Sequence, residues 1–289
     1  MATFLINANP KTRRPETIPA AQKIIDWGES SGNVIRLTKN TADLLGRTDQ
    51  AVSDSEIQDS IDILISLGGD GTILSSARMV AGSNILIWGV NTGTLGFLTE
   101  TSLVELEADL SKVAEGKYQI DERMTLETTL EGHDLPLALN DVVIDRGAVS
   151  RIITVDMFAN SMPIATYQAD GLILATPTGS TAYSLSVGGP ILAPSMRAII
   201  ASPISAFGFY GRPFVFSENT ELEVRVHSAH GKSALTIDGQ SAIELPELAR
   251  FTVKKGKSVV RLIRFHDSSF YQVLRDKLHW GEPPHADSE

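Results

Sequence analysis

The chain has 289 residues, which is long for a single hydrophobic core and suits two domains. It is 42% hydrophobic with a formal net charge of −10, so it has the composition of a globular protein and a charge that repels DNA and anionic membranes. It contains no cysteine, which excludes disulfides, thiolate metal sites and cysteine catalysis. No secretory signal or apolar run of roughly 18 residues is present, so we expect a cytoplasmic protein.

The first part of the chain alternates short apolar runs with helical patterns. Strands are expected at residues 3–8, 33–37, 61–67 and 85–90, and helices at residues 15–27, about 72–80 and 103–115. Strands and helices that alternate at this spacing predict βαβ units and a parallel sheet. We therefore expect a Rossmann-like α/β domain over residues 1–120.

Near residue 118 the pattern changes to short strands separated by turns. Strands are expected at residues 125–130, 141–144, 152–158, 164–167, 171–175, 221–226, 234–237 and 259–265, with one helix starting inside residues 180–187. This pattern predicts a β-rich domain over residues 121–266. Residues 268–278 return to helical spacing, and the polar tail after Trp280 is expected to be disordered.

A glycine-rich segment, Gly68-Gly69-Asp70-Gly71-Thr72, directly follows the expected strand at residues 61–67. Glycines allow a sharp turn that directs several backbone N–H groups to one point, and the start of the next helix favours an anion. The segment is therefore suited to holding phosphates, with Asp70 as a base or metal partner near the reacting group. Taken alone, it is equally well interpreted as a tight turn with a capping aspartate.

Residues 91–97, Asn-Thr-Gly-Thr-Leu-Gly-Phe, follow the expected strand at residues 85–90. They lie at the carboxyl edge of the parallel sheet, where open α/β sheets bind ligands. Alone, this segment reads as a flexible loop. Two glycine-rich segments at one sheet edge together favour a nucleotide crevice.

The run from Asp170 to Pro190 passes from a strand through a hydroxyl-rich turn into a short helix. Its hydroxyl and N–H groups suit ribose, phosphate and adenine edges, and Tyr183 could stack on a ring. A capped helix is the simpler alternative, but the run holds more Thr, Ser and Gly than capping needs. Asn140-Asp141 could recognise an adenine edge and ribose hydroxyls, although alone the pair is typical of a strand-entry turn.

These four elements, in this order, resemble the NAD kinase family. The family pattern has G-G-D-G-T, then G-x-N-x-G-x-L-G-F-L, then N-E or N-D, then D-G-L-x-x-x-T-P-T-G-S-T-A-Y-S-L-S-x-G-G-P; residues 68–72, 89–98, 140–141 and 170–190 match it. Asp238-Gly239-Gln240 and Lys277-Leu278-His279-Trp280 are also similar to family features. The resemblance covers nearly the whole chain. The last long motif is highly specific, whereas G-G-D-G occurs in other kinases too.

The resemblance implies phosphoryl transfer from ATP, or from polyphosphate, to the 2′-hydroxyl of the adenosine ribose of NAD, with Mg²⁺ as cofactor. Asp70 would act as the base on that hydroxyl. The donor phosphates or the pyrophosphate would be held by Gly68, Gly69, Gly71 and Thr72. NAD would be bound by Phe97, Asn140, Asp141, Asp170, Thr181, Ala182, Tyr183 and Ser186, in part across a subunit boundary.

The resemblance also implies a homodimer or homotetramer, in which a final helix at about residues 267–280 folds back onto the first domain. The chain departs from the family at Asp141, where Glu is frequent, and at Gln168, where many bacterial members have Arg. Residues 205–213 match only in Arg212-Pro213, so no other role is carried over from there.

Two other interpretations remain open at this point. One is a non-catalytic NAD(P)-binding regulator on the same scaffold, which would not use Asp70. The other is a lipid or sugar kinase that shares only the G-G-D-G segment, which the long motif at residues 170–190 disfavours.

Overall fold

The computed structural model describes residues 2–9, 15–93, 96–147, 152–208, 211–228, 232–265 and 270–279. The chain divides into two compact units. Unit 1 comprises Met1–Val80, Asn84–Asp121 and Arg261–Glu289, and unit 2 comprises Ala81–Ser83 and Glu122–Val260. Across the described ranges, no helix combines the length and apolar character needed to cross a membrane.

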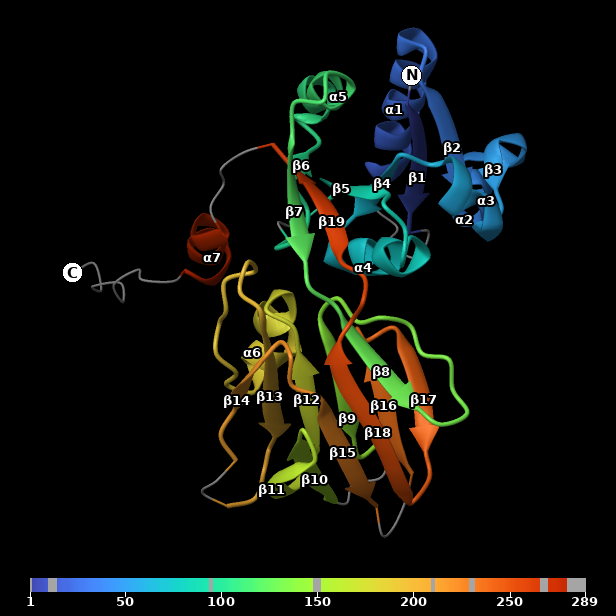
Figure 1. The fold of residues 1–289 in the computed structure, drawn as a ribbon. Coiled ribbons are helices and arrows are strands. Elements are labelled where there is room, and N and C mark those ends of the chain that lie inside the picture. The colour runs from blue at the N-terminus through green and yellow to red at the C-terminus, as the bar shows by residue number, and fades with distance from the viewer. Residues whose placement is uncertain are drawn as a thin grey trace, which may run out of the picture. The chain divides into compact units, whose positions relative to one another are not determined.

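Unit 1 contains a mainly parallel sheet with helices (Figure 1). Its strands are β1 (Thr3–Ala8), β2 (Val34–Thr38), β3 (Ala51–Val52), β4 (Ile63–Gly68), β5 (Leu86–Asn91), β6 (Thr101–Ser102), β7 (Gln119–Arg123) and β19 (Val260–Arg264). Its helices are α1 (Thr17–Ser31), α2 (Lys39–Leu45), the 3-10 turn η1 (Thr48–Gln50), α3 (Asp54–Ser60), α4 (Asp70–Met79), α5 (Leu106–Ala114) and α7 (Phe270–Leu278). The strand order is β3-β2-β1-β4-β5-β19-β7, with β6 paired to β5.

Helices cover both faces of this sheet, which explains why its central strands are almost entirely apolar. Phe4 of β1 belongs to a core cluster with Ile24 of α1 and Leu110 of α5, and the β5 residues on either side of Gly89 belong to the same cluster. Because successive strand residues face opposite ways, Gly89 faces the other side. There a Cβ at Gly89 would lie 2.6 Å from Cδ1 of Ile73, so α4 packs closely on that face.

The order of the first five strands places a topological switch point between β1 and β4. From β1 the chain moves outward to β2 on one side, whereas from β4 it moves to β5 on the other. Open α/β sheets bind ligands outside the carboxyl ends of the strands at such a point. Because β4 ends at Gly68, the glycine-rich segment begins at this edge of the sheet.

Unit 2 is built from two antiparallel sheets. The five-stranded sheet contains β8 (Leu126–Leu130), β10 (Ile153–Ala159), β11 (Met162–Ala169), β15 (Leu222–His227) and β18 (Leu248–Lys255) in the order β11-β10-β15-β18-β8. The six-stranded sheet contains β9 (Asp141–Asp145), β12 (Gly171–Ala175), β13 (Ala198–Ile204), β14 (Phe214–Ser217), β16 (Ser233–Ile237) and β17 (Ser241–Leu245) in the order β14-β13-β12-β9-β16-β17. The 3-10 turn η2 (Thr178–Thr181) and the short helix α6 (Tyr183–Ser186) lie between β12 and β13.

The two sheets of unit 2 share one hydrophobic core. Val155 and Phe251 of the five-stranded sheet belong to the same buried cluster as Leu172 and Leu174 of the six-stranded sheet. The opposite face of β12 is covered as well, because Ile173 belongs to a second cluster. All of β12 is therefore buried, whereas β10 alternates buried and partly exposed residues.

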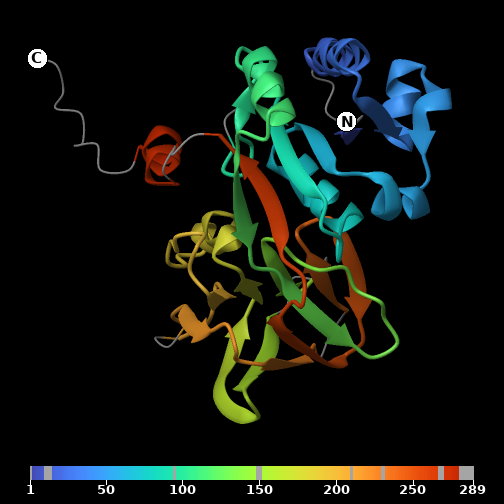
Figure 2. The same cartoon turned by 45° about the horizontal axis from the view of Figure 1, so that its top comes forward.

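The strand expected at residues 259–265 is β19, and its assignment to the β-rich part of the chain is wrong. It lies in the sheet of unit 1, where Leu262 pairs in parallel with Ile87 of β5. Both views show β19 running beside β7 (Figures 1 and 2). The sequence of a short apolar strand does not indicate which strand it pairs with. The pattern therefore could not show to which of the sheets residues 259–265 belong.

The structure also contains elements that the sequence pattern did not predict. They are α2, η1, α3, β3, β6, β7, β13, β14, β17 and β18. In β13, Pro203 pairs with Leu172 of β12 but lies beyond the residues that pair with β14. A proline has no N–H to donate to a neighbouring strand. It is tolerated at position 203 because β14 does not pair with β13 there. The tail after Trp280 lies outside the described residues.

A buried polar chain connects β5, β6 and α5. Trp88 Nε1 donates to Thr101 Oγ1 at 2.8 Å, and Thr101 Oγ1 donates to Asp109 Oδ2 at 2.8 Å. Lys112 Nζ lies 2.7 Å from the other carboxylate oxygen of Asp109. Because Trp88, Thr101 and Asp109 are all at most 1% exposed, water cannot replace these bonds.

We expect Thr101→Val to lower the free energy of unfolding by about 1–3 kcal/mol, because it leaves the Trp88 N–H and one oxygen of Asp109 buried without a partner. Denaturant unfolding of purified protein measures this change. Thr129→Val, at an exposed position on β8, is the matched control and should change stability by less than about 0.5 kcal/mol. Equal effects of the two variants would contradict the prediction.

Candidate active site

Asp70 is the first residue of α4, and Gly69 is the N-cap, with extended backbone at φ −111 and ψ −167. Thr72 N donates to Gly69 O at 2.9 Å, which closes the first turn. The helix expected from about residue 72 thus begins two residues earlier than predicted. Because glycine has a low helix propensity, the sequence pattern did not indicate that the helix begins at Asp70. An aspartate in the first turn is nevertheless favoured by the helix dipole.

The Asp70 carboxylate holds the segment that follows β5. Its Oδ2 accepts from Phe97 N at 2.8 Å, and its Oδ1 accepts from Leu98 N at 3.0 Å. Gly96 allows this approach, because a Cβ there would overlap the carboxylate and lie 2.7 Å from Asp70 Cγ. The structure therefore brings the first and second predicted segments together; Thr94 and Leu95 lie outside the described residues.

The remaining predicted residues of the first segment lie at the end of β4 and the start of α4. Gly68 is the last residue of β4, and a Cβ there would overlap the Thr72 side chain. Gly71 is exposed, whereas Thr72 is buried. Gly68 is thus required for the close approach of β4 to the first turn of α4.

The last described helix of the chain contacts Phe97. Lys277 Nζ lies over the Phe97 ring, 4.5 Å from its centroid. Leu274 of α7 is buried. The helix expected at residues 268–278 is α7, which covers Phe270–Leu278, and residues 268–269 lie outside the described part.

In unit 2, the Asn140-Asp141 segment touches the hydroxyl-rich turn. Thr176 N donates to Asn140 O at 2.9 Å, and Thr176 Oγ1 donates to Leu139 O at 2.6 Å. A Cβ at Gly179 would lie 2.5 Å from the carbonyl carbon of Asn140. A glycine is therefore needed at position 179 to let η2 pack on this segment.

The hydroxyl groups of the turn divide into two sets. Ser180 Oγ donates to Pro177 O at 2.6 Å, and the Ser184 hydroxyl lies 3.0 Å from that of Ser202; these serines are fully buried. The predicted NAD-binding residues of this turn are instead partly or fully exposed: Thr181, Ala182, Tyr183 and Ser186. Much of the hydroxyl excess thus holds the turn together, and the predicted residues are among the accessible ones.

Asp238 belongs to a tight hairpin turn between β16 and β17. Its φ is 51 and that of Gly239 is 63, and Gln240 N donates to Ile237 O at 3.0 Å. Two consecutive positive φ angles with this bond define a type I′ turn, which Asp-Gly sequences favour. The Asp238-Gly239 pair is therefore typical of a hairpin turn. Asp238 was not among the predicted site residues.

The Asp238 carboxylate accepts three backbone N–H groups from the Asn140-Asp141 segment. Oδ2 accepts from Leu139 N at 2.9 Å, and Oδ1 accepts from Asn140 N at 2.7 Å and from Asp141 N at 3.0 Å. Asp238 is only 6% exposed. Three parts of the chain thus meet at Asn140: its own segment, the turn at Thr176 and the Asp238 hairpin.

The Asp141 side chain is 5% exposed. Its burial raises the pKa of its carboxyl to about 7, and the nearby negative charge of Asp238 adds to the increase. Desolvation and a like charge both disfavour the ionised form. At neutral pH, Asp141 is therefore divided between a carboxylate that accepts hydrogen bonds and a carboxylic acid that can also donate one.

Asp170 lies away from these groups. In the pairing of β9 with β12, Asp141 is opposite Ala175, whereas Gly171 is opposite Asp145. Asp170 is thus at the far end of β12, roughly 15 Å from the Asn140 segment at about 3.3 Å per residue. Its carboxylate pairs with Arg146 at 3.2 Å. The structure does not bring Asp170 together with the other predicted residues of unit 2 within one chain.

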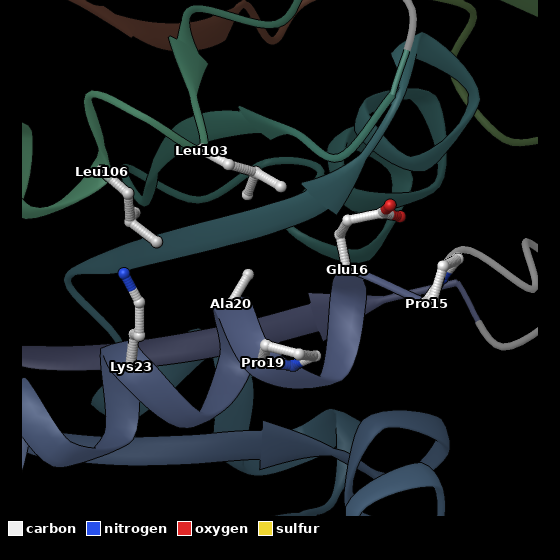
Figure 3. A pocket seen from close by; sticks show the side chains of 7 residues that line it. All are labelled: Pro15, Glu16, Pro19, Ala20, Lys23, Leu103 and Leu106. Carbon is white, nitrogen blue, oxygen red and sulfur yellow. The ribbon is translucent and has the colours of Figure 1, made fainter.

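Two surface hollows lie apart from all of these residues. One, of about 310 Å³, lies between α1 and the segment at the start of α5, and its apolar wall includes Ala20, Leu103 and Leu106 (Figure 3). The other, of about 400 Å³, lies on the five-stranded sheet beside Arg225 and Arg250. Neither is lined by a predicted site residue.

Comparison with known proteins decides the family. A family model described as the ATP-NAD kinase N-terminal domain matches residues 7–118, and one described as the ATP-NAD kinase C-terminal domain matches residues 139–265. The chain belongs to the NAD kinase family. The NAD kinase of Syntrophotalea carbinolica is 37% identical over 276 residues, 94% of this chain and 97% of that protein. The NAD kinase of Moorella thermoacetica is 39% identical over 271 residues, 93% of this chain and 87% of that protein.

Membership of the NAD kinase family confirms the predicted enzyme class, a kinase that acts on NAD. It decides against both the lipid or sugar kinase and the non-catalytic regulator. The predicted fold class, a parallel α/β part followed by a β-rich part, is also confirmed. Yeast NADH kinase, solved with NADH, has a TM-score of 0.88 at 24% identity and covers 100% of this chain and 90% of that chain. An NAD kinase from Archaeoglobus fulgidus, solved with ATP, has a TM-score of 0.77 at 24% identity and covers 96% of this chain and 99% of that chain.

We expect the raised pKa of Asp141 to lower stability as pH rises. From its ordinary pKa of 3.8 up to about 7, the folded chain retains a proton that the unfolded chain has released. The contribution of Asp141 to the free energy of unfolding therefore falls across this window and levels off above it. The stability of Asp141→Asn relative to the parent chain should therefore increase between pH 4.5 and pH 8 by up to a few kcal/mol, at about 1.4 kcal/mol per pKa unit.

Denaturant unfolding at the two pH values measures this effect. Val143→Ala, at a buried position of the same strand, is the control, because it removes no titratable group and should lower stability equally at both. If Asp141→Asn and the parent chain lost the same stability between pH 4.5 and pH 8, the raised pKa would be wrong.

Proposed function

We propose that Asp70 is the general base that accepts the proton of the 2′-hydroxyl of the adenosine ribose of NAD. The observation that carries this proposal is the position of its carboxylate at the switch-point edge of the sheet, fixed there by the N–H groups of Phe97 and Leu98. A carboxylate offers about four lone-pair directions, so two remain for a substrate hydroxyl. A base held in a fixed orientation is what proton transfer requires.

The donor phosphates, in this proposal, are held by Gly68, Gly69, Gly71 and Thr72. The backbone N–H groups at the start of α4 favour an anion. There is room for an anion beside Gly69, since a Cβ there would meet no atom within 4 Å. ATP is the proposed donor, in line with the Archaeoglobus fulgidus relative that was solved with ATP.

Magnesium would neutralise charge on the donor phosphates during transfer. No group of three or more His, Asp or Glu side chains that could enclose a cation is found in the described ranges. Mg²⁺ commonly binds through one or two carboxylates together with substrate phosphates. In this proposal the phosphate oxygens of the donor would hold the cation, and Asp70 would keep its remaining lone pairs for the substrate hydroxyl.

NAD binding is proposed for Phe97, Asn140, Asp141, Thr181, Ala182, Tyr183 and Ser186. The support in unit 2 is the direct contact of the Asn140 segment with the turn that exposes Tyr183 and Ser186. Tyr183 is 45% exposed and available to stack on a ring. A yeast relative of the same fold was solved with NADH. Units 1 and 2 would then be the two domains, with the donor site, the base and Phe97 in the first and the other NAD-binding residues in the second.

Asp170 is proposed to reach NAD from a second copy of the chain. The distance along β12 separates it from the other NAD-binding residues of its own copy, as described above. A homodimer or homotetramer would supply it from the partner. This interpretation accounts for a residue of the family motif that lies at the wrong end of the strand for a site within one chain.

The reaction is tested by incubating purified protein with NAD, Mg²⁺ and ATP and measuring NADP by mass spectrometry. We expect NADP to form with ATP as donor. Parallel reactions with polyphosphate in place of ATP, and with NADH in place of NAD, define the range of donor and acceptor. Product with polyphosphate but not with ATP would overturn the proposed donor.

We expect Asp70→Asn to lower kcat by about 10²–10⁴-fold, because the amide cannot accept the hydroxyl proton. NAD affinity, measured by calorimetry without donor, should fall far less than kcat, because the proposed NAD-binding residues of unit 2 are unchanged. Asp62→Asn is the matched control: Asp62 lies at the opposite end of β4, and its carboxylate likewise accepts a backbone N–H, that of Thr3, at 2.8 Å. That variant should keep normal turnover. Near-normal kcat in Asp70→Asn would rule out the base assignment.

A further inference from the structure

The Asp238 carboxylate is the centre of a rigid junction in unit 2. It accepts three successive backbone N–H groups, those of Leu139, Asn140 and Asp141, at 2.7 to 3.0 Å. The bonds join positions 97 to 99 residues apart in the chain. Hydrogen bonds from backbone N–H to an ionised carboxylate are stronger than neutral ones, and this carboxylate is shielded from water.

The segment is held from the other side as well. Asn140 O accepts from Thr176 N at 2.9 Å, and Gly179 packs against the Asn140 carbonyl. With the N–H groups bound by Asp238 and the carbonyl bound by the turn, the backbone at Asn140 has little freedom. The directions of the Asn140 and Asp141 side chains are therefore set by the hairpin between β16 and β17.

We propose that Asp238 is a positioning residue for the NAD kinase reaction, which presents Asn140 and Asp141 to the nucleotide by fixing their backbone. This inference rests on the proposed NAD-binding role of those two residues. Asp238 would act through them and would not itself touch the reacting atoms. Only a carboxylate can fill the role, because both of its oxygens accept.

The test is steady-state kinetics of Asp238→Asn. Asparagine tolerates the positive φ of the turn, but its amide nitrogen would face an N–H group in place of an acceptor. We expect KM for NAD to rise about tenfold or more, while kcat and KM for ATP stay within about twofold, because the lost interaction contributes to NAD binding in ground and transition states alike. Amide hydrogen exchange at residues 139–141 should become faster.

Asn160→Ala is the matched control. Asn160 also lies in a hairpin turn at positive φ, and its Oδ1 accepts a backbone N–H, that of Glu221, at 3.0 Å. This variant removes a comparable hairpin contact from the turn between β10 and β11 and should leave KM for NAD unchanged. An equal rise of KM in Asn160→Ala would show a general loss of stability and overturn the proposal.

Asn140→Ala separates this proposal from the one on which it rests. If Asn140→Ala leaves KM for NAD unchanged, the binding role of Asn140 fails. If Asn140→Ala raises it and Asp238→Asn does not, the positioning role fails. If both raise it, their effects in the double variant should add only in part, because Asp238 acts partly through Asn140 and partly through Asp141. Should Asp238→Asn not fold, Asp238→Glu moves the carboxylate by one methylene and is expected to raise KM for NAD likewise.

Discussion

Two carboxylates that accept backbone N–H groups organise the loops on which the proposed chemistry depends. A loop at a sheet edge has no ladder to satisfy its N–H groups, and leaving them unpaired and buried is costly. The Asp70 carboxylate accepts two N–H groups of the segment after β5, and the Asp238 carboxylate accepts three around the start of β9. In each case the backbone N–H groups of the chain partly balance the negative charge of the carboxylate.

In the proposed reaction Asp70 has two functions at once. Its oxygens accept the N–H groups of the Phe97 segment, and the same oxygens would take the proton of the substrate hydroxyl. Phe97 is contacted in turn by Lys277, so α4 and α7 both contact the segment after β5. The loop geometry and the base are therefore not independent: a side chain that cannot accept two N–H groups alters both, and the effects on turnover and on loop order arise together.

Much of the fold could be predicted because local pattern and tertiary environment agree. The bounds of β1 and β12 were predicted to the residue, since both are short apolar runs between turn signals, and the G-G-D-G segment was predicted at the end of a buried strand. The short helices α2 and α3 are too polar to show a clear apolar period. The strand β13 was not predicted because it contains Pro203. A proline is compatible with a strand only where no neighbour needs its N–H, and the sequence does not show which strands pair there. The contact of Asp238 with the Asn140 segment was not predicted because its partners lie nearly a hundred residues away, and no local pattern indicates such a contact.

The position of β19 has a consequence for the order in which the protein is made. The strand lies in the sheet between β5 and β7, yet it is encoded after all of unit 2. During synthesis the first seven strands emerge with that place in the sheet empty, and it is filled only when about nine-tenths of the chain has left the ribosome. Unit 2 can close its sheets earlier, since its strands are contiguous in the chain. The Rossmann-like part, although synthesised first, is therefore the last to be completed, and a truncation that removes residues 260–289 would leave its sheet open at that place.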